Sequence, residues 1–341
     1  MKYLSIILLV CNILLSNNFC LSERSKPYYP NINRDDPAII KAKLYVHIIK
    51  DSQGNGQLDA DNLENGFNIL FDNYNQLNIL FEIAEQDTIY SDFFHNTGFI
   101  TARDSLLYSR FHQDGIDIYI GREDEQGIGY SFFPLTAVAL RGSSDDNYSV
   151  SGHYVVAHEV GHILGLVHTH QGNSQGDGPE YKEKVVRLDE NDCYANCDST
   201  ADHFCDTPSD PVLILTVNQD CIYSSDYTDP CGYSYIPNVY NIMSYTHMLC
   251  GLSLSESQKD LAIYTIQNES DISDTIISLT NIIGDFNVDQ TLNILDIVML
   301  VNFILSDENP SSYQIEMMDF NNDLLVDIVD IINLIQIIFN N

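Results

Sequence analysis

The segment from His158 to His168, with the sequence HEVGHILGLVH, constrains the fold of this chain more than any other stretch. On a helix, His158 and His162 lie one turn apart on the same face, so both imidazoles can reach one metal ion. Gly165 can adopt the left-handed conformation that ends a helix, and the chain can then deliver His168 from another direction. Three protein ligands leave a fourth tetrahedral position open, which is typical of a catalytic zinc site.

Glu159 follows the first histidine of this motif. From that position its carboxylate can act on a water at the metal without binding the metal itself. The alternative interpretation is an amphipathic core helix with purely structural histidines, and Val156, Val160 and Ile163 do form an apolar face. Because that face lies opposite the histidines, core packing accounts for only one side of the helix.

Two further motifs accompany the zinc-binding pattern and indicate a protein family. Residues 158–168 match H-E-x-x-H-x-x-G-x-x-H, the zinc motif of the metzincin metalloproteases, and Thr169 resembles the pappalysin branch. Residues 241–245, NIMSY, resemble the Met-turn, and residues 205–208, CDTP, are also similar to pappalysins. The resemblance covers the region 41–270. It implies an α+β metzincin-type catalytic domain with a mixed twisted sheet, a zinc-binding active-site helix and a Met-turn.

The same resemblance implies roles for two residues of the Met-turn. Met243 would lie beneath the zinc site as a packing base, and Tyr245 would contact the zinc or stabilise the tetrahedral intermediate. An ordinary packed tyrosine is the alternative for Tyr245. His170 stands two residues after His168 and could compete for the metal. The histidines without ligand spacing are expected to be structural or exposed: His47, His95, His112, His153, His203 and His247.

Residues 1–22 predict a secretory signal peptide, because Lys2 precedes the apolar run Leu4–Leu15 and a polar stretch that ends in small residues. A transmembrane anchor is the less favoured interpretation, since a span needs about 20 apolar residues. A lipid anchor on Cys20 is the remaining alternative. Residues 23–40 are polar and contain prolines, which predicts an irregular lead-in.

The formal net charge of −34 limits the expected partners. Nucleic acids and anionic membranes repel so acidic a surface, so neither is an expected partner. After the signal peptide, no apolar run in the sequence is long enough to cross a bilayer. Solvated carboxylates and calcium ligands account for the acidity.

Six cysteines remain after the signal peptide, and all of them follow the zinc-binding motif. An even number in a secreted chain indicates three disulfides that hold a loop-rich region together. The metzincin resemblance implies that Cys221 pairs with Cys250. The rival interpretation is a second zinc site with Cys193, Cys197 and Cys205 as ligands. The six are Cys193, Cys197, Cys205, Cys221, Cys231 and Cys250.

Hydrophobic periodicity predicts the regular elements of the catalytic domain. Pro134 favours a sheet edge for the last expected strand, and the metzincin resemblance places the substrate there by strand addition. Ser151 is expected to cap the zinc-binding helix, and Ser255 with Gln258 predicts a capping box for the last helix. Strands are expected at 42–50, 79–83, 116–121 and 130–141, and helices at 61–77 and 256–268.

The C-terminus contains an internal repeat. Residues 285–305 align with residues 319–339 without gaps, at a spacing of 34 residues and with nine of 21 positions identical. Each copy carries oxygen-bearing side chains at loop positions 1, 3, 5, 9 and 12, the spacing at which an EF-hand loop binds calcium. An apolar helix should follow each loop, at 297–305 and 331–339. The ten side chains are Asp285, Asn287, Asp289, Asn293 and Asp296, then Asp319, Asn321, Asp323, Asp327 and Asp330.

Two calcium loops, each followed by one helix, resemble a type I dockerin. The resemblance implies a small all-α domain at 284–341, preceded by a linker at 271–283, with two Ca²⁺ ions and a cohesin-like or cell-surface partner. Position 6 of the loops, usually glycine, is Gln290 and Leu324, which should strain the turn. A stabilising module that does not bind cohesin is therefore an alternative, as are acidic turns without calcium.

These features together predict a secreted zinc-dependent endopeptidase that acts on proteins or peptides and carries a calcium-binding attachment module. One zinc ion would be held by His158, His162 and His168, with Glu159 as the general base. The alternative is a non-catalytic scaffold or adhesion protein that keeps the zinc fold for structure. Glu159 favours the enzyme, because a structural site has no need of a general base.

Overall fold

The computed structural model describes most of the chain from Ile40 onward. The expected signal peptide lies outside the described residues, as does the expected lead-in up to residue 39. Ser151, Cys193, Asn287, Asp289, Gln290 and Leu324 also lie outside them. The described ranges are 40–56, 60–97, 105–107, 110–121, 129–132, 136–141, 153–171, 196–229, 231–269, 272, 276–277, 283–286, 291–305, 318–321, 323 and 325–340.

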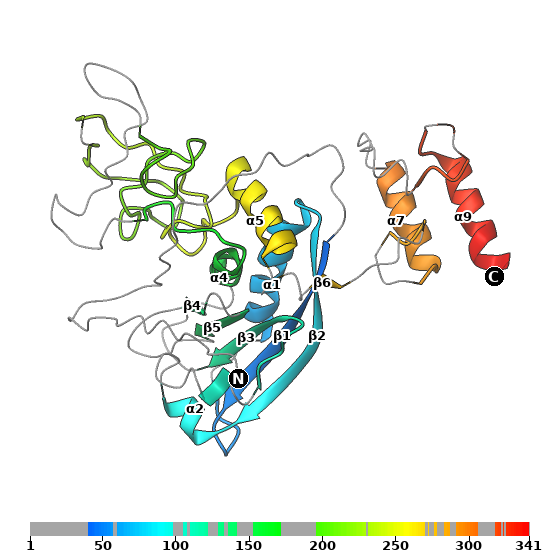
Figure 1. The fold of residues 1–341 in the computed structure, drawn as a ribbon, viewed down its shortest axis with the longest axis horizontal. Helices are drawn as coiled ribbons and strands as arrows, with labels where there is room; N and C mark the ends of the chain where they lie inside the picture. The colour runs from blue at the N-terminus through cyan, green and yellow to red at the C-terminus, as the bar shows by residue number, and fades with distance from the viewer. Residues whose placement is uncertain are drawn as a thin grey trace, which may run out of the picture.

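A mixed sheet forms the framework of the larger part of the chain (Figure 1). Its strands are β1 (Ile40–Lys50), β2 (Ile79–Tyr90), β3 (Ile116–Gly121), β4 (Gly129–Ser131), β5 (Ala137–Arg141) and β6 (Ile276–Ile277). The main path has the order β2-β1-β3-β5-β4, and β6 pairs with β1 beside it. The pairs from β2 to β5 are parallel, whereas β4 is antiparallel to β5 and β6 is antiparallel to β1.

Both faces of β1 are covered by other parts of the chain. Successive side chains of a strand point to opposite faces. Leu44 and Val46 belong to the larger hydrophobic core, and Ile49 belongs to a smaller core on the opposite face. His47 points to the same face as Ile49 and is only 1% exposed. A polar ring at such a position needs polar partners inside the protein.

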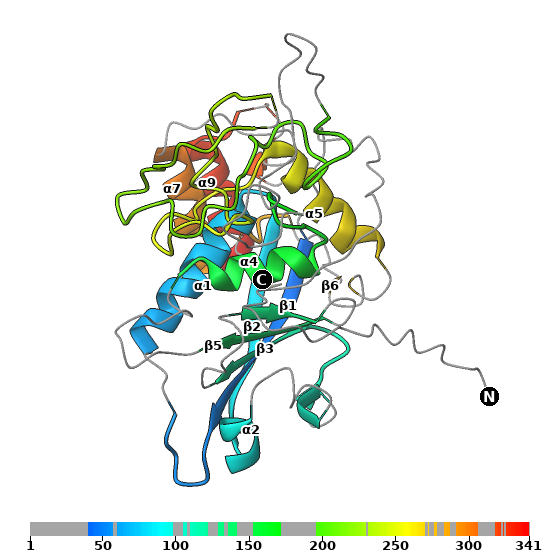
Figure 2. The ribbon, with the colours of Figure 1, turned by 90° about the vertical axis from the view of Figure 1, so that its left-hand side faces the viewer.

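Helices α1 (Ala60–Asn75) and α4 (Val155–Ile163) cover the face of the sheet that carries the larger core (Figure 2). The apolar stripe of α1, including Phe67 and Leu70, is spaced at helical intervals and is buried. The Tyr74 hydroxyl donates a hydrogen bond of 3.1 Å to the carbonyl of Ala157, which joins the two helices. Every residue of α4 is buried. Its histidines and its glutamate are therefore held away from bulk water.

The opposite face of the sheet has a smaller apolar cover. Ile89, Leu106 and Tyr119 form its core with two alanines of β5. Phe94 of the short helix α2 (Asp92–Asn96) packs against this cluster. The hydroxyl of Ser91 accepts a hydrogen bond from the Phe94 amide and so caps α2.

The expectation of one strand at 130–141 is wrong. The structure divides this stretch into β4 and β5, with Tyr130 opposite Ala139 in an antiparallel register. The amide of Phe132 donates to the carbonyl of Ala137 at 2.9 Å, next to the connection that contains Pro134. Residues 130–141 form one largely apolar run in the sequence, so the hydrophobic pattern does not indicate where it divides. Of these two strands, β4 lies at an end of the main path, whereas β5 lies between β3 and β4.

Strand β2 is longer than its expected range of 79–83. It continues to Tyr90 and pairs with β1 over this whole length, with a bulge between Leu44 and Tyr45 of β1. Residues 84–88 are exposed or half-buried, and most of them are polar. On the main path β2 has a strand on one side only. Its outer half therefore lacks the apolar alternation from which strands are predicted.

Ser151 does not cap α4. The helix begins at Val155 with Tyr154 at the N-cap position, and no side chain caps it. The Tyr154 hydroxyl instead lies 3.1 Å from the carbonyl oxygen of Ser244 and 3.2 Å from that of Thr246. The start of α4 is thus tied to the end of the segment 241–245 and to the residue that follows it.

Helix α5 (Glu256–Asn268) has the expected bounds and the expected capping box. Gln258 is fully buried. Its Oε1 accepts hydrogen bonds of 2.8 Å from the amide of Ser255 and from the Asn241 side chain. After α5, Ile272 packs in the larger core and β6 pairs with β1, so part of the expected linker contacts the sheet domain.

The cysteine-rich segment is loop-rich and contains the Cys221–Cys250 disulfide that the metzincin resemblance implied. Cys197 pairs with Cys205. This bridge uses two of the three thiols of the alternative cysteine zinc site, so that alternative is wrong. Cys231 is also disulfide-bonded.

The C-terminal helices α7 (Ile294–Leu305) and α9 (Ile328–Asn340) share a hydrophobic cluster that includes Leu300 and Leu334. Each helix begins three residues earlier than expected. Asn293 and Asp327 accept hydrogen bonds from backbone amides of the first turn, which is the action of an N-cap. Within the described ranges, no helix has the length and apolarity that crossing a bilayer requires.

Candidate metal centre

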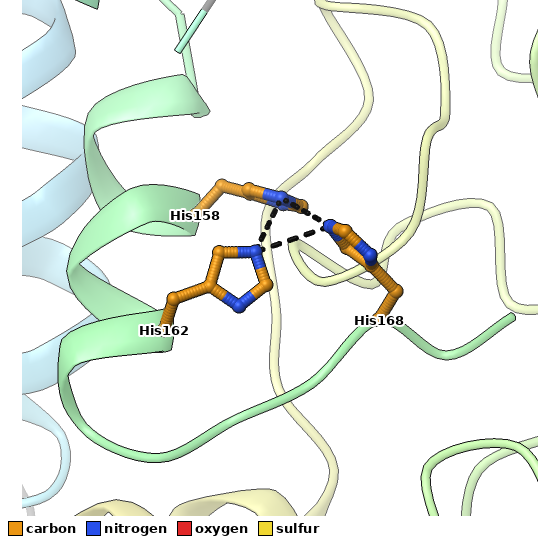
Figure 3. A group of neighbouring side chains, drawn as sticks. All are labelled: His158, His162 and His168. Atoms are coloured by element: carbon orange, nitrogen blue, oxygen red, sulfur yellow. Dashed lines mark hydrogen bonds between the residues drawn. The ribbon is translucent and has the colours of Figure 1, made fainter. Parts of the chain in front are cut away.

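Three histidine side chains converge at α4 and the segment that follows it (Figure 3). The Nε2 atom of His162 lies 3.2 Å from that of His158 and 3.1 Å from that of His168. The third side of the triangle, between His158 and His168, is 3.2 Å. Tetrahedral bonds of about 2.0–2.1 Å from zinc to nitrogen would separate the ligand atoms by about 3.3 Å. The triangle therefore has the size of a zinc site.

The outer nitrogens of two rings bond to backbone carbonyls. His158 Nδ1 donates to the carbonyl of Ile242 at 2.5 Å, and His162 Nδ1 donates to that of Leu166 at 2.8 Å. Carbonyls only accept, so the hydrogens lie on Nδ1 and the Nε2 lone pairs face the centre of the triangle. Burial lowers the pKa of His158 and His168 well below the usual histidine value, and the nearby His162 lowers both further. Neutral imidazole is the form that binds metals.

The expected turn at Gly165 brings His168 to the other two rings. Gly165 has a φ of 91°, in the left-handed region. Its amide donates to the carbonyl of His162 at 3.0 Å, and the amide of Leu166 donates to that of Gly161 at 2.9 Å. These bonds end the helix and reverse the chain. The ring of His168 then lies beside those of His162 and His158, which precede it by six and ten residues.

Glu159 is buried beside His158, with 3% of its surface exposed. Gly129 of β4 lies directly against its carboxyl group, because a Cβ atom at residue 129 would be 2.6 Å from Glu159 Oε1. A side chain at residue 129 of the edge strand would therefore collide with the carboxylate of Glu159. Glu159 and the edge strand are adjacent parts of one site.

Met243 lies under α4. Its side chain is fully buried, and a Cβ atom at Gly161 would be 2.6 Å from its sulfur. The Met243 amide donates a hydrogen bond of 2.9 Å to Asn241 Oδ1. Its carbonyl accepts a hydrogen bond of 3.1 Å from the amide of Thr169. Met243 thus packs on the helix that carries the histidines.

Tyr245 lies against the histidines through its ring. Its ring centroid is 4.6 Å from that of His168 and 5.9 Å from that of His158. His170 stacks on His168 at 4.9 Å with nearly parallel planes, and it also contacts Tyr245 at 4.5 Å. His170 Nδ1 lies 3.8 Å from the carboxylate of Asp210. It is thus a neighbour of the third histidine and is not in the group of converging ligand atoms.

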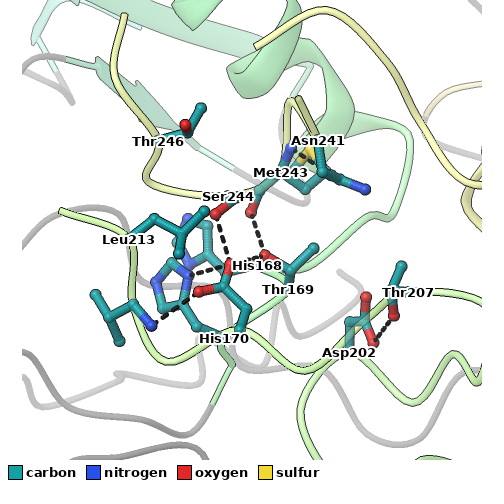
Figure 4. A network of polar contacts seen from close by, with 12 residues as sticks. His168, Thr169, His170, Asp202, Thr207, Leu213, Asn241, Met243, Ser244 and Thr246 are labelled. Atoms are coloured by element: carbon teal, nitrogen blue, oxygen red, sulfur yellow. Dashed lines mark hydrogen bonds and ion pairs between the residues drawn. The ribbon is translucent and has the colours of Figure 1, made fainter. Parts of the chain in front are cut away.

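Asp210 joins the segments that carry Thr169, Ser244 and Val212, and Figure 4 shows the surroundings of Thr169 and Ser244. Its Oδ2 accepts hydrogen bonds of 2.5 Å from the hydroxyls of Thr169 and Ser244, and its Oδ1 accepts one of 2.8 Å from the amide of Val212. Burial raises the pKa of this carboxyl, but His170 and the two hydroxyls together hold it below its usual value. The sequence pattern did not identify Asp210, since it lies 41 residues from Thr169.

A second group of possible ligands was also missed. His47 and His112 converge with Asp117, although the two histidines are far apart in the sequence. No spacing rule predicts such a meeting, because it depends on which strands become neighbours. Among the described residues, this group and the three-histidine group are the two that have the composition and spacing of a metal site.

In the two C-terminal loops, the carboxylates at position 12 have matching contacts. Asp296 accepts hydrogen bonds of 2.8 Å from the amides of Phe286 and Asn293. Asp330 accepts the equivalent bonds, also of 2.8 Å, from Phe320 and Asp327. The backbones of the two loops therefore close around equivalent carboxylates. Asp285 and Asp319, at position 1, are also buried.

Comparison with known proteins supports a two-part organisation. Residues 283–339 match the model of the Dockerin type I domain. Two fungal proteins named extracellular metalloproteases are also similar to this chain. That of Podospora anserina is 28% identical over 41% of this chain and 53% of its own length. That of Colletotrichum graminicola is 26% identical over 41% of this chain and 56% of its own length.

The chain spans about half the length of these curated relatives. Among solved structures, mirolysin from Tannerella forsythia superposes with a TM-score of 0.50 at 16% identity, over 70% of this chain and 97% of mirolysin. At 16% identity, this likeness shows a similar fold and nothing further. The chain thus combines an α+β domain with a fold similar to that of mirolysin and a C-terminal dockerin domain.

Proposed function

We propose that this chain is a secreted zinc-dependent endopeptidase of the pappalysin branch of the metzincins. The observation that carries the proposal is the convergence of three Nε2 atoms, 3.1–3.2 Å apart, beside the buried carboxylate of Glu159. We assign residues 41–270 to the peptidase domain, 284–341 to the dockerin domain, and 271–283 to a linker of which Ile272 and β6 pack on the peptidase domain. The similarity to extracellular metalloproteases supports the same assignment.

The donor set fits zinc. Three imidazole Nε2 atoms converge on one point, and two of the rings are held by backbone carbonyls on the opposite nitrogen. A zinc ion bound there supplies Lewis-acid activation of a water and of the peptide carbonyl. His158, His162 and His168 hold this position without rearrangement, because their rings are fixed by burial and by the turn at Gly165.

Glu159 is the general base in this proposal. Its carboxylate takes a proton from the attacking water and passes it to the leaving amine. Tyr245 lies beside His158 and His168, from where its hydroxyl can stabilise the tetrahedral intermediate. Met243 has no part in the chemistry and packs under α4.

The substrate binds in extended form along β4. This strand lies at the end of the main path of the sheet, and its Gly129 contacts Glu159. A peptide that adds to the sheet as a further strand would have its backbone directed past the carboxylate. Strand addition selects for extended, unfolded segments, so loops and unfolded proteins are the expected substrates.

The dockerin domain is the attachment module, with one Ca²⁺ ion in each loop and a cohesin-like or cell-surface partner. The described ligands have oxygen side chains at the spacing that calcium requires, and the position-12 carboxylates are aligned by backbone amides. Residues 1–22 direct secretion, and the extracellular relatives agree with this location.

Cleavage of denatured casein by the purified chain from Glu23 onward tests the peptidase assignment. Zinc chelation and Glu159→Ala should each abolish cleavage, and added zinc should restore only the wild type. Retention of zinc by the Glu159→Ala variant would separate loss of the base from loss of the metal. A folded, zinc-loaded wild type that cleaves neither casein nor gelatin would overturn the proposal in favour of a non-catalytic scaffold.

A further inference from the structure

A second cluster of ligand atoms lies on the face of the sheet opposite α4. Asp117 Oδ1 is 2.9 Å from His47 Nε2 and 2.7 Å from His112 Nδ1. His47 belongs to β1, Asp117 belongs to β3, and His112 lies in the segment that precedes β3. Each residue contributes one atom to a compact group of the kind that holds a metal ion. The cluster takes no part in the peptidase site, from which the sheet separates it.

The remaining atoms of these side chains are held by neighbours that would orient a metal ligand. His47 Nδ1 lies 2.6 Å from Asp87 Oδ1 on β2 and donates there. Without a metal, Nε2 donates to Asp117 Oδ1 at 2.9 Å, and a bound ion would replace that proton and take the Nε2 lone pair. The second oxygen of Asp117, Oδ2, accepts a hydrogen bond of 2.9 Å from the backbone N–H of His112. This bond leaves Oδ1 facing the two imidazole rings. A carboxylate behind a ligating histidine is the usual support of a protein metal site.

Aromatic rings fix the two imidazoles in place. Tyr45 stacks on His112 with centroids 3.7 Å apart, and Tyr119 stacks on His47 at 4.9 Å. His47 and Asp117 are almost completely buried, whereas 29% of the His112 side chain is exposed. An ion could therefore enter on the side of His112, where water can occupy a fourth position. Two nitrogen ligands and one oxygen ligand favour zinc over calcium or magnesium.

We propose that His47, His112 and Asp117 bind a second zinc ion, with Asp87 holding His47 in the required orientation. The ion joins β1, β3 and the segment before β3, and through Asp87 it also holds β2. Because only the folded chain brings these segments together, binding stabilises the fold. The site is structural, since a distant position on the other face of the sheet cannot reach a peptide at Glu159.

Counting zinc in the full secreted chain tests this proposal. After exchange against zinc in the presence of excess calcium, the wild type should hold two zinc ions per chain. His112→Asn should hold one, because the asparagine amide can still donate to Asp117 but cannot replace the imidazole as a zinc ligand. His162→Ala, at the three-histidine centre, should also hold one. The double variant should hold none.

Peptidase activity separates this proposal from the proposed function. His112→Asn should lose one zinc ion with casein cleavage unchanged, whereas His162→Ala should lose one zinc ion together with cleavage. His95→Asn is the matched control on the same side of the sheet domain and should keep both ions. In His162→Ala, added zinc should raise the melting temperature, and this shift should vanish when His112→Asn is added.

One zinc ion in the wild type, or two in a folded His112→Asn variant, would overturn the proposal. The first result would mean that Asp117 joins the two histidines by shared protons alone. Near-ultraviolet circular dichroism establishes whether each variant is folded. If His112→Asn does not fold, Asp87→Asn replaces it, and a tenfold or greater loss of affinity at the second site is then the expected result.

Discussion

The carboxylate of Asp210 accepts a hydrogen bond of 2.5 Å from the hydroxyl of Ser244, the residue that follows Met243. The same oxygen accepts a hydrogen bond from the hydroxyl of Thr169, the residue that follows the third histidine. One buried carboxylate thus fixes the spacing between the turn under α4 and the segment that carries His168. Replacement of this carboxylate should loosen the centre without removing any of its ligands.

Asp210→Ala should destabilise the protein and weaken zinc binding. It leaves the hydroxyls of Thr169 and Ser244 and the amide of Val212 without their acceptor, at a cost of about 3 kcal/mol in unfolding free energy. Zinc affinity should fall by roughly 10–100-fold, the usual effect of losing an outer support. Urea unfolding and zinc titration measure the two effects. The exposed Asp220→Ala is the matched control, and equal behaviour of the two variants would contradict the role of Asp210.

The contribution of Asp210 should also depend on pH. Its folded-state pKa lies below the ordinary value of 3.8, so its stabilising effect is complete above pH 3.8 and is lost as the pH falls through the folded pKa. In chelator-treated protein, the stability difference between wild type and Asp210→Asn should therefore be constant near neutrality and should shrink below pH 3.8. A difference that grows on acidification would contradict this reading of the pKa.

Glu159→Gln should retain zinc and lose turnover. The amide has the shape of the carboxylate but cannot take a proton from water, and a general base contributes roughly 10²–10⁴-fold to the rate. The measurements are kcat on a peptide substrate and zinc per chain. A variant that keeps more than a tenth of the wild-type kcat would mean that another group accepts the proton.

Gly129→Ala should reduce activity although residue 129 contacts no ligand of the centre. The new methyl group would lie 2.6 Å from Glu159 Oε1, so either β4 or the carboxylate has to move. Misplacement of a catalytic group by about 1 Å can lower the rate by roughly 10²-fold. Zinc content should be unchanged. Gly232→Ala is the control for activity, because a Cβ atom there would meet no neighbour within 4 Å; its φ of 86° makes the alanine strained, so the stabilities of the two variants are not compared.

Asp330→Ala should destabilise the dockerin domain and leave the proposed peptidase domain unaffected. The change removes the acceptor for the amides of Phe320 and Asp327, which costs about 2 kcal/mol before any loss of calcium is counted. Calorimetry should show a lower transition for residues 284–341, while casein cleavage is unaffected. Simultaneous loss of both transitions would contradict the independence of the two parts.

Features that depend on a few consecutive residues could be predicted from the sequence. The capping box at Ser255 and Gln258 fixes the start of α5, and Gly165 ends α4 in the left-handed conformation as expected. The duplicated loops likewise predicted α7 and α9 to within three residues. In each case the determining contacts lie within one or two turns of chain.

Features that depend on the meeting of distant segments could not be predicted. Asp210 gains its role from Thr169 and Ser244, on two other segments, and no local pattern marks it. His47 meets His112 only because β1 lies beside β3 in the sheet. The second half of β2 is polar because it lies at an edge, which the sequence cannot indicate before the sheet order is known.

The side chain of Gln258 connects α5, the last helix of the proposed peptidase domain, to the candidate metal centre. Its Oε1 accepts a hydrogen bond from the side-chain amide of Asn241. The Oδ1 atom of Asn241 in turn accepts a hydrogen bond from the backbone amide of Met243, which lies beneath α4. When the ribosome has synthesised residues 158–168, all three histidines are present. Gln258, which supports Met243 through Asn241, has not yet been made. During synthesis, the bond from Asn241 to Gln258 can form only after α5 has been made, about 90 residues after the third histidine, so the outermost support of the centre is also the last to be added.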